Sequence, residues 1–178
     1  LSTLAAILGV CTCAAQHIDH ARSLAPFVPS PQLVVEKMLA AADLKPGEIL
    51  YDLGCGDGRV LITAAQKFRA KAVGVELSPK LTALAMDRIK LEGLQDQVKV
   101  VQGDLLEVDL SEADVVTLYL LTQSNDKLRP NLEKYLKRGA RVVSHDFQVR
   151  GWKPVRVEKA EIHNRTHSIY VYEMPPAR

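Results

Sequence analysis

Short apolar runs alternate with amphipathic stretches along most of the chain. The apolar runs fall at 49–53, 72–76, 98–101, 113–121 and 140–144, the pattern of buried strands. Apolar positions at helical spacing lie between them and predict helices over residues 59–68, 78–91 and 125–136. Strands alternating with helices predict a mostly parallel sheet.

The two ends of this pattern complete the fold prediction. Segments 155–162 and 168–173 are rich in β-branched and aromatic residues and predict a C-terminal antiparallel strand pair. Before the first strand, Ser30 stands in the N-cap position and Pro31 at the first position of another predicted helix. The expected fold is α/β: a doubly wound, mostly parallel seven-strand sheet with helices on both faces.

The stretch from Leu1 to Ala15 is apolar and uncharged. Its length fits a targeting or anchoring segment and is short for a spanning helix. A helix that packs on the domain is the alternative interpretation. We therefore expect a targeting or anchoring segment with its connector at 1–25, and one domain at 26–178.

Composition argues against several classes of protein, among them nucleic-acid-binding, disulfide-rich and metal-binding proteins. A chain of 178 residues with 47% hydrophobic and 25% charged residues suits one globular domain. A net charge of +2 lacks the basic footprint of nucleic-acid binding. The three cysteines, Cys11, Cys13 and Cys55, provide neither a disulfide framework nor zinc-ligand spacing. No other cluster has metal-ligand spacing, so no metal is predicted.

A glycine-rich turn follows the first strand. Gly54, Gly56 and Gly58 alternate, with Asp52 before them and Arg59 after them. This is neither the G-x-G-x-x-G dinucleotide fingerprint nor a P-loop, which needs G-K-[ST]. A leading acid disfavours a pyrophosphate and suits a cationic ligand without phosphate, such as S-adenosylmethionine (SAM). The alternative is a tight turn without a ligand.

Two further acids end the next strands. Glu76 comes about twenty residues after the glycine turn, where a carboxylate can bind both ribose hydroxyls. Asp104 can accept a hydrogen bond from an adenine amino group while Leu105 packs on the ring. Each acid alone could be a solvated strand end, but the three together favour a nucleoside. The predicted cofactor-binding residues are Pro29, Tyr51, Asp52, Gly54, Cys55, Gly56, Asp57, Gly58, Glu76, Leu77, Asp104 and Leu105.

The order of these motifs resembles the class I, seven-strand, Rossmann-like SAM-dependent methyltransferases. The segments 26–31, 115–122 and 141–147, with Gly151 and Trp152, are more narrowly similar to the small protein-lysine methyltransferases of archaea and their mitochondrial relatives. This resemblance implies SAM as cofactor and a lysine side chain of a protein as methyl acceptor. It also implies that Pro29 lines the cofactor pocket.

Candidate catalytic residues follow the fourth and fifth strands. Tyr119 could wall a lysine channel by cation–π contact or belong to the core. Asn125 could hold the amine or cap a helix, and His145 and Asp146 could orient the amine, accept a proton or be structural. No dedicated base is predicted, because a pocket beside the sulfonium itself lowers the pKa of the amine.

The motif [DN]-P-P-[FY] is absent after the fourth strand, where residues 120–123 read Leu-Leu-Thr-Gln. Its absence disfavours DNA bases and glutamine as acceptors. A small-molecule N- or O-methyltransferase and a SAM-binding module without turnover remain the alternatives. Because SAM is supplied in the cytosol, we expect a cytoplasmic protein or one attached to the cytoplasmic face of a membrane. Export remains an alternative.

Overall fold

The computed structural model describes residues 27–162 and 164–176. Within this part of the chain, seven strands form one sheet in the order β3-β2-β1-β4-β5-β7-β6. Strands β1 to β5 run parallel, and β7 pairs antiparallel with both β5 and β6. The elements are α1 (Gln32–Ala41), β1 (Ile49–Leu53), α2 (Arg59–Phe68), β2 (Lys71–Glu76), α3 (Pro79–Leu91), β3 (Val98–Gln102), η1 (Leu105–Glu107), β4 (Val115–Leu118), α4 (Thr122–Tyr135), β5 (Arg141–His145), β6 (Arg156–Ile162) and β7 (Arg165–Glu173).

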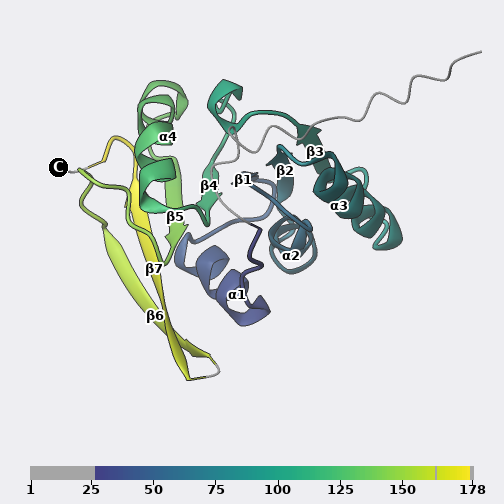
Figure 1. Cartoon of the computed structure of the whole chain (residues 1–178), viewed down its shortest axis with the longest axis horizontal. Coiled ribbons are helices and arrows are strands. Elements are labelled where there is room, and N and C mark those ends of the chain that lie inside the picture. The colour runs from purple at the N-terminus through teal and green to yellow at the C-terminus, as the bar shows by residue number, and fades with distance from the viewer. Residues whose placement is uncertain (1–26, 163, 177–178) are drawn as a thin grey trace, which may run out of the picture.

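The two faces of the sheet carry separate cores, because successive side chains of a strand point to opposite faces. Leu50, Val115 and Val143 pack with the buried residues of α1 and α2. Their neighbours Tyr51, Val116 and Val142 pack with those of α4. Among the described residues, α1, α2 and α3 lie on one side of the sheet and α4 on the other (Figure 1). The predicted mixed sheet with helices on both faces is present, with most of the helices on one face.

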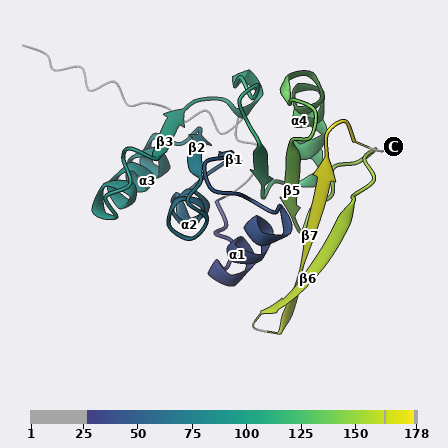
Figure 2. The ribbon, with the colours of Figure 1, turned by 180° about the vertical axis from the view of Figure 1, so that it is seen from behind.

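The C-terminal pair is a long hairpin at one edge of the sheet (Figure 2). Helix α1 lies against β5, β6 and β7 as well as α2. Val35 and Leu39 of α1 are fully buried there, in one core with Ile169 and Val171 of β7. The first described helix is therefore held by the last strands of the chain.

Three predicted boundaries were wrong. Ser30 is not the N-cap of α1: Pro31 takes that position without a side-chain cap, and the Ser30 hydroxyl instead lies 2.8 Å from His145 Nδ1. Strand β4 ends at Leu118, whose partner Ser144 is the last residue of β5 that pairs with it, so Tyr119 lies beyond the sheet. Helix α4 begins at Thr122, three residues before the predicted start.

Residues 1–26 lie outside the described part of the chain, so the predicted segment from Leu1 to Ala15 does too, as do Cys11 and Cys13. Within the described residues, no helix is both long and apolar enough to cross a membrane. Cys55 is a buried free thiol whose pKa is raised by burial and by neighbouring carboxylates. A Cβ at Gly74 would come within 2.6 Å of its sulfur, so Cys55 fills the space that Gly74 leaves.

Candidate functional site

The glycine-rich loop connects β1 to α2 at the carboxyl edge of the sheet. Its first amides, of Gly54 and Cys55, donate to the carbonyl of Val75 at 2.9 and 3.1 Å, which ties the loop to β2. Gly56 has a φ of 53°, in the left-handed region, and a Cβ there would lie 2.4 Å from the ring of Phe27. Only glycine fits both constraints, because the Phe27 ring packs directly on the backbone of Gly56.

The acids predicted at three strand ends lie at the ends of neighbouring parallel strands. Glu76 ends β2, and its two carboxylate oxygens accept hydrogen bonds from the amides of Gly56 at 3.0 Å and Ser78 at 2.9 Å. Asp104 follows β3 and accepts from the amide of Leu106 at 2.9 Å. Local backbone amides thus hold both carboxylates at this edge.

Asp52 near the end of β1 is buried. The hydroxyl of Thr117 on β4 donates to Asp52 Oδ1 at 2.7 Å. Burial, helped by the charges of Glu76 and Asp57 and opposed by the Thr117 hydrogen bond, raises the pKa of Asp52 to about 7. A positively charged ligand beside it would favour the ionised carboxylate.

Asp57 of the glycine loop forms ion pairs with two arginines. Its carboxylate pairs with Arg59 at 2.7 Å and Arg88 at 2.6 Å, which joins the start of α2 to the last turn of α3. Burial raises its pKa, but the hydrogen bond and charge of Arg59 and the charge of Arg88 outweigh this and hold the pKa of Asp57 below its usual range. The carboxylate is therefore engaged in supporting the loop.

The other predicted cofactor residues differ in exposure. Tyr51 and Leu105 belong to the core on the α4 face, and Cys55 belongs to the core on the opposite face. Leu77 is half-buried after β2, whereas Pro29, like Gly54, is exposed. Pro29 and Gly54 are therefore accessible to a ligand, whereas the side chains of Tyr51 and Cys55 pack in the two cores.

The predicted acceptor residues gather at the ends of β4 and β5. The rings of Tyr119 and His145 are stacked, with centroids 3.9 Å apart and planes inclined by 27°. The ring of Phe147 lies 6.2 Å from that of Tyr119. Tyr119 is therefore part of an aromatic group at the sheet edge and not a residue of the buried strand.

Asn125 is fully buried in the first turn of α4. Its side-chain amide donates to the carbonyl of Phe147 at 3.1 Å. The capping alternative is wrong, because the N-cap residue is Leu121. Asn125 Oδ1 has no hydrogen-bond partner among the described residues. An unpaired buried acceptor costs about 1–3 kcal/mol, so this oxygen is suited to a donor that arrives with a ligand.

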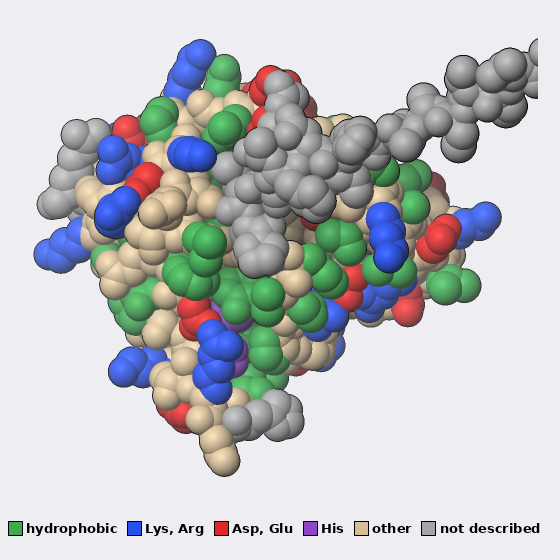
Figure 3. Space-filling model, in the orientation of Figure 1, with side chains coloured by type: hydrophobic (Ala, Val, Ile, Leu, Met, Phe, Trp, Pro, Cys, Tyr) green, Lys and Arg blue, Asp and Glu red, His purple; other side chains and the backbone are tan. Residues whose placement is uncertain are grey.

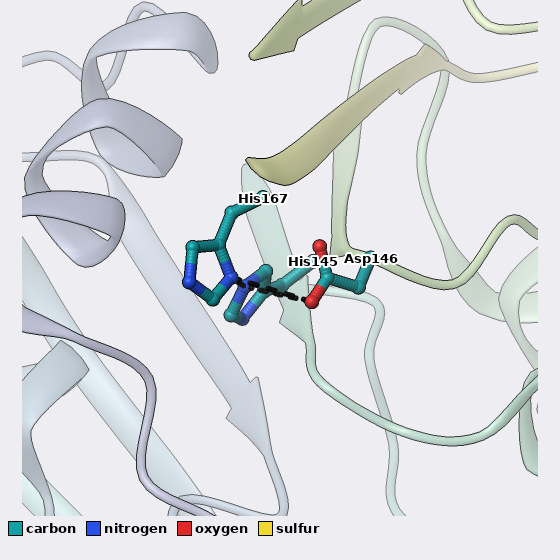
Figure 4. Close-up of side chains that lie close together, drawn as sticks. All are labelled: His145, Asp146 and His167. Atoms are coloured by element: carbon teal, nitrogen blue, oxygen red, sulfur yellow. Dashed lines mark hydrogen bonds and ion pairs between the residues drawn. The ribbon is translucent and has the colours of Figure 1, made fainter. Parts of the chain in front are cut away.

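His145 and Asp146 form a cluster with His167 of β7, which the sequence analysis missed (Figure 4). His145 Nε2 lies 2.9 Å from His167 Nδ1, which lies 3.3 Å from Asp146 Oδ2. Burial lowers the pKa of His145 to about 4, although Asp146 opposes this shift. The spacing of these residues gave no signal, because the antiparallel pairing of β5 with β7 brings them together.

Figure 3 shows this part of the surface: a small histidine area lies between hydrophobic side chains and adjacent charged groups. Only 4% of His167 is exposed and none of His145. The histidines therefore lie just beneath the surface, where their partners are protein groups.

A comparison with protein-family models identifies the family of this chain. The model of the ANTKMT methyltransferase domain matches residues 52–156, from the end of β1 to the start of β6. The chain belongs to this methyltransferase family. The resemblance seen in the sequence is thereby confirmed.

Several relatives of this ANTKMT-type chain carry names. A protein-lysine N-methyltransferase of Saccharolobus islandicus is 49% identical over 83% of this chain and 92% of its own length. The adenine nucleotide translocase lysine N-methyltransferase of mouse is 32% identical over 84% of this chain, which spans 63% of that protein. A human lysine N-methyltransferase named for a subunit of ATP synthase is 34% identical over 74% of this chain and 56% of its own length.

Solved structures agree on the fold, and one of them contains S-adenosyl-L-homocysteine, the product form of SAM. A structure described as an RNA methyltransferase from Salinibacter ruber in complex with S-adenosyl-L-homocysteine superposes with a TM-score of 0.80 and 45% identity, over 85% of this chain and 96% of that one. The Thermus thermophilus TrmN structure, with a TM-score of 0.69 and 17% identity over 80% of this chain and 48% of that one, shares the fold alone. The ANTKMT-type domain is a Rossmann-like methyltransferase, and SAM is its cofactor.

Proposed function

We propose that this ANTKMT-type domain transfers the methyl group of SAM to the side-chain amine of a lysine in a protein substrate. The observation that carries the proposal is the 49% identity with the Saccharolobus islandicus protein-lysine N-methyltransferase over 92% of that protein's length. The named mouse and human lysine methyltransferases support the same acceptor, although this chain spans less than two thirds of each.

The donor would bind at the ends of β1, β2 and β3. Asp52 and the glycine loop would hold the charged methionine part of SAM, and Glu76 would bind the ribose hydroxyls. Asp104 and Leu105 would hold the adenine. The local hydrogen bonds of Glu76 and Asp104 support this assignment, because they fix both carboxylates before a ligand arrives.

The acceptor lysine would arrive at the ends of β4 and β5. Its neutral amine attacks the methyl carbon, the carbon–sulfur bond breaks, and the electron pair leaves on sulfur to give S-adenosylhomocysteine. Tyr119 would wall the channel, and the unpaired oxygen of Asn125 would accept a hydrogen bond from the amine. Orientation of the two reactants supplies most of the acceleration.

His145 would serve in this reaction as a neutral group. With a pKa of about 4 it is too weakly basic to remove a proton from an ammonium whose ordinary pKa is near ~10.4. The proton is lost instead because the partly desolvated amine lies beside a sulfonium, which lowers its pKa. Asp146 would act on His145 and not on the substrate.

The proposal also covers the domain bounds and the location of the protein in the cell. Residues 26–178 would form the methyltransferase domain, with a targeting or anchoring segment at 1–25 that keeps the domain in the cytoplasm or on the cytoplasmic face of a membrane. Fractionation of cells that express the full chain and a chain beginning at Pro26 tests this. Equal membrane fractions for the two would contradict an anchoring role.

The methyl acceptor is identified with radiolabelled SAM. The purified chain is incubated with cell extract, and label is followed into protein, RNA and small molecules, with the Glu76→Ala variant as a blank. We expect label on lysine residues of protein, located by mass spectrometry. Label on RNA would give this chain the activity in the Salinibacter ruber description and overturn the lysine proposal, as would label on small molecules alone.

A further inference from the structure

Both ring nitrogens of His145 have a hydrogen-bond partner, so the partners determine which nitrogen carries the proton. Nδ1 lies 2.8 Å from Ser30 Oγ and Nε2 lies 2.9 Å from His167 Nδ1. The carbonyl of Ser30 accepts from the Arg59 guanidinium at 2.8 Å, next to the glycine loop. His145 therefore links the strand that ends beside the acceptor site to the segment that borders the cofactor loop.

Asp146 holds the other end of this chain of contacts. Its Oδ1 accepts from the amide of Ser168 at 2.8 Å, and its Oδ2 pairs with Arg165 at 2.9 Å. The residue has a φ of 58°, which aspartate tolerates better than most residues. Its carboxylate is thus fixed by β7 on the side of the cluster opposite to Ser30.

These contacts determine where the protons lie. An ionised carboxylate only accepts, and Asp146 Oδ2 lies nearer to His167 Nδ1, at 3.3 Å, than to His145 Nε2, at 3.5 Å, so we assign the proton to His167 Nδ1. The N–H of His167 Nδ1 also lies 2.9 Å from His145 Nε2. His145 Nε2 therefore accepts this hydrogen bond and carries no proton. The proton of His145 is consequently on Nδ1 and is donated to Ser30 Oγ, which leaves the Ser30 O–H free to donate elsewhere.

We propose that His167 is a positioning residue for methyl transfer, which with Asp146 holds His145 in the Nδ1–H tautomer. His145 in turn orients the Ser30 hydroxyl beside the cofactor loop and supports the ring of Tyr119 stacked on it. The inference rests on the proposed function, because it assigns His167 to that reaction. His167 touches neither reactant and acts through His145.

The same atoms could in principle hold a divalent metal ion, but two features favour hydrogen bonds. The nitrogens of His145 and His167 are 2.9 Å apart, shorter than the about 3.3 Å between ligands of a tetrahedral zinc. Arg165 places a positive charge on the oxygen of Asp146 that would have to bind the ion. A zinc titration is therefore part of the test.

Two variants of nearly equal shape separate the hydrogen bond from the packing. His167→Asn keeps an N–H donor where Nδ1 lies, whereas His167→Leu removes it. Since loss of a group that orients a site residue costs about 10- to 100-fold, we expect kcat to fall by this factor in His167→Leu and by less than about 5-fold in His167→Asn. KM for SAM should change little in both. Thr166→Val, on the same strand but exposed, is the matched control.

The ring nitrogens are read directly by two-bond proton–nitrogen NMR of labelled protein. We expect His145 and His167 of the wild type to be protonated at Nδ1 only, and His145 to lose this preference in His167→Leu. Protonation of wild-type His145 at Nε2, unchanged kcat in His167→Leu, or equal losses in both variants would overturn the proposal. Stoichiometric zinc binding that is lost in His167→Leu would overturn it in favour of a metal site. If the wild type labels no protein lysine, the proposed function fails and the catalytic part of this inference fails with it, while the spectrum still decides the tautomer.

Discussion

The donor edge, at the ends of β1, β2 and β3, and the acceptor edge, at the ends of β4 and β5, hold their polar side chains in different ways. At the donor edge, Glu76 and Asp104 are held by backbone amides no more than 20 residues away. At the acceptor edge, His145 is held by Ser30, 115 residues away, and by His167 on another strand. Apart from Asp52, which is bonded to Thr117 of β4, the donor edge thus depends on local loop geometry, whereas the acceptor edge depends on the assembled tertiary structure.

Under the proposed function, this difference matches what each edge would bind. SAM is the same molecule for every methyltransferase of this fold, and a strand end with its following loop can hold it. The acceptor differs between enzymes, and the side chains proposed to meet it or to position the site come from the ends of β4 and β5, from α4, from β7 and from the segment before α1. Variants should therefore separate the two edges: those at the first should change SAM affinity, and those at the second should change kcat.

Glu76→Ala should have the largest effect. It removes the acceptor for two ribose hydroxyls, and each hydrogen bond to a charged group contributes about 1.5–3 kcal/mol, so the Kd for SAM should rise at least about 100-fold. Isothermal titration calorimetry measures this. Glu107→Ala removes an exposed acid near the same edge and should leave the Kd unchanged. A Kd within 3-fold of wild type for Glu76→Ala would contradict the donor assignment.

Asn125→Ala should lower kcat and leave the affinity for SAM nearly unchanged. It removes the unpaired acceptor and the hydrogen bond to the Phe147 carbonyl, and at about 1–2 kcal/mol for the two we expect kcat to fall about 5- to 30-fold. The Kd for SAM should stay within about 3-fold, because the change is at the other edge. Steady-state kinetics with the labelled protein substrate and calorimetry provide the two numbers. Gln123→Ala on the exposed side of α4 is the control, and a loss of SAM affinity without a change in kcat would refute the division into two edges.

The pH dependence of SAM binding gives a smaller effect at the donor edge. Asp52 has a raised pKa of about 7 in the free protein, so it carries a proton below pH 7. A cationic ligand favours the carboxylate and expels that proton, so affinity should increase with pH and level off above 7. If the pKa in the complex falls below 5, the Kd should be about 8-fold lower at pH 7.5 than at pH 6. Asp52→Asn should bind more weakly and lose this slope, and an equal slope in that variant would assign the proton to another group.

The smallest effect is expected from protonation of His145. Because burial lowers its pKa to about 4, the ring stays neutral throughout the range in which the enzyme is assayed. The value of kcat should rise with pH as the acceptor ammonium loses its proton. The profile should show no inflection near 6.5, the ordinary pKa of histidine. Measurements from pH 5.5 to 9.5 test this. An inflection near 6.5 that disappears in His145→Asn would make His145 a titrating catalytic group.

The sequence predicted the donor edge better than the acceptor edge, and for a physical reason. Asp52, Glu76 and Asp104 are recognisable because each follows an apolar run, and the carboxyl ends of parallel strands meet at one edge. The predicted helix over 78–91 likewise begins as expected, with Ser78 as the N-cap of α3, where its hydroxyl accepts from the amide of Leu81. Local spacing is sufficient for such features.

Ser30 shows where local spacing stops being sufficient. It stands directly before a proline at a helix start, the sequence of a cap, yet its hydroxyl is bonded to His145. His167 gave no signal at all, because its role depends on the register of β7 against β5. Tyr119 and the start of α4 were misplaced because apolar residues 119–121 continue the pattern of β4 after its pairing has ended. Each of these depends on contacts between distant segments.

The packing of α1 against β7 has a consequence for biosynthesis. Helix α1 leaves the ribosome early, but Ile169 and Val171, which help to cover its apolar face, are made about 130 residues later. At ~5–20 residues per second the face remains uncovered by them for about 7 to 26 seconds. A nascent chain must carry that uncovered face through most of translation. Until the C-terminal hairpin is synthesised, that face exposes apolar surface of the kind that chaperones shield.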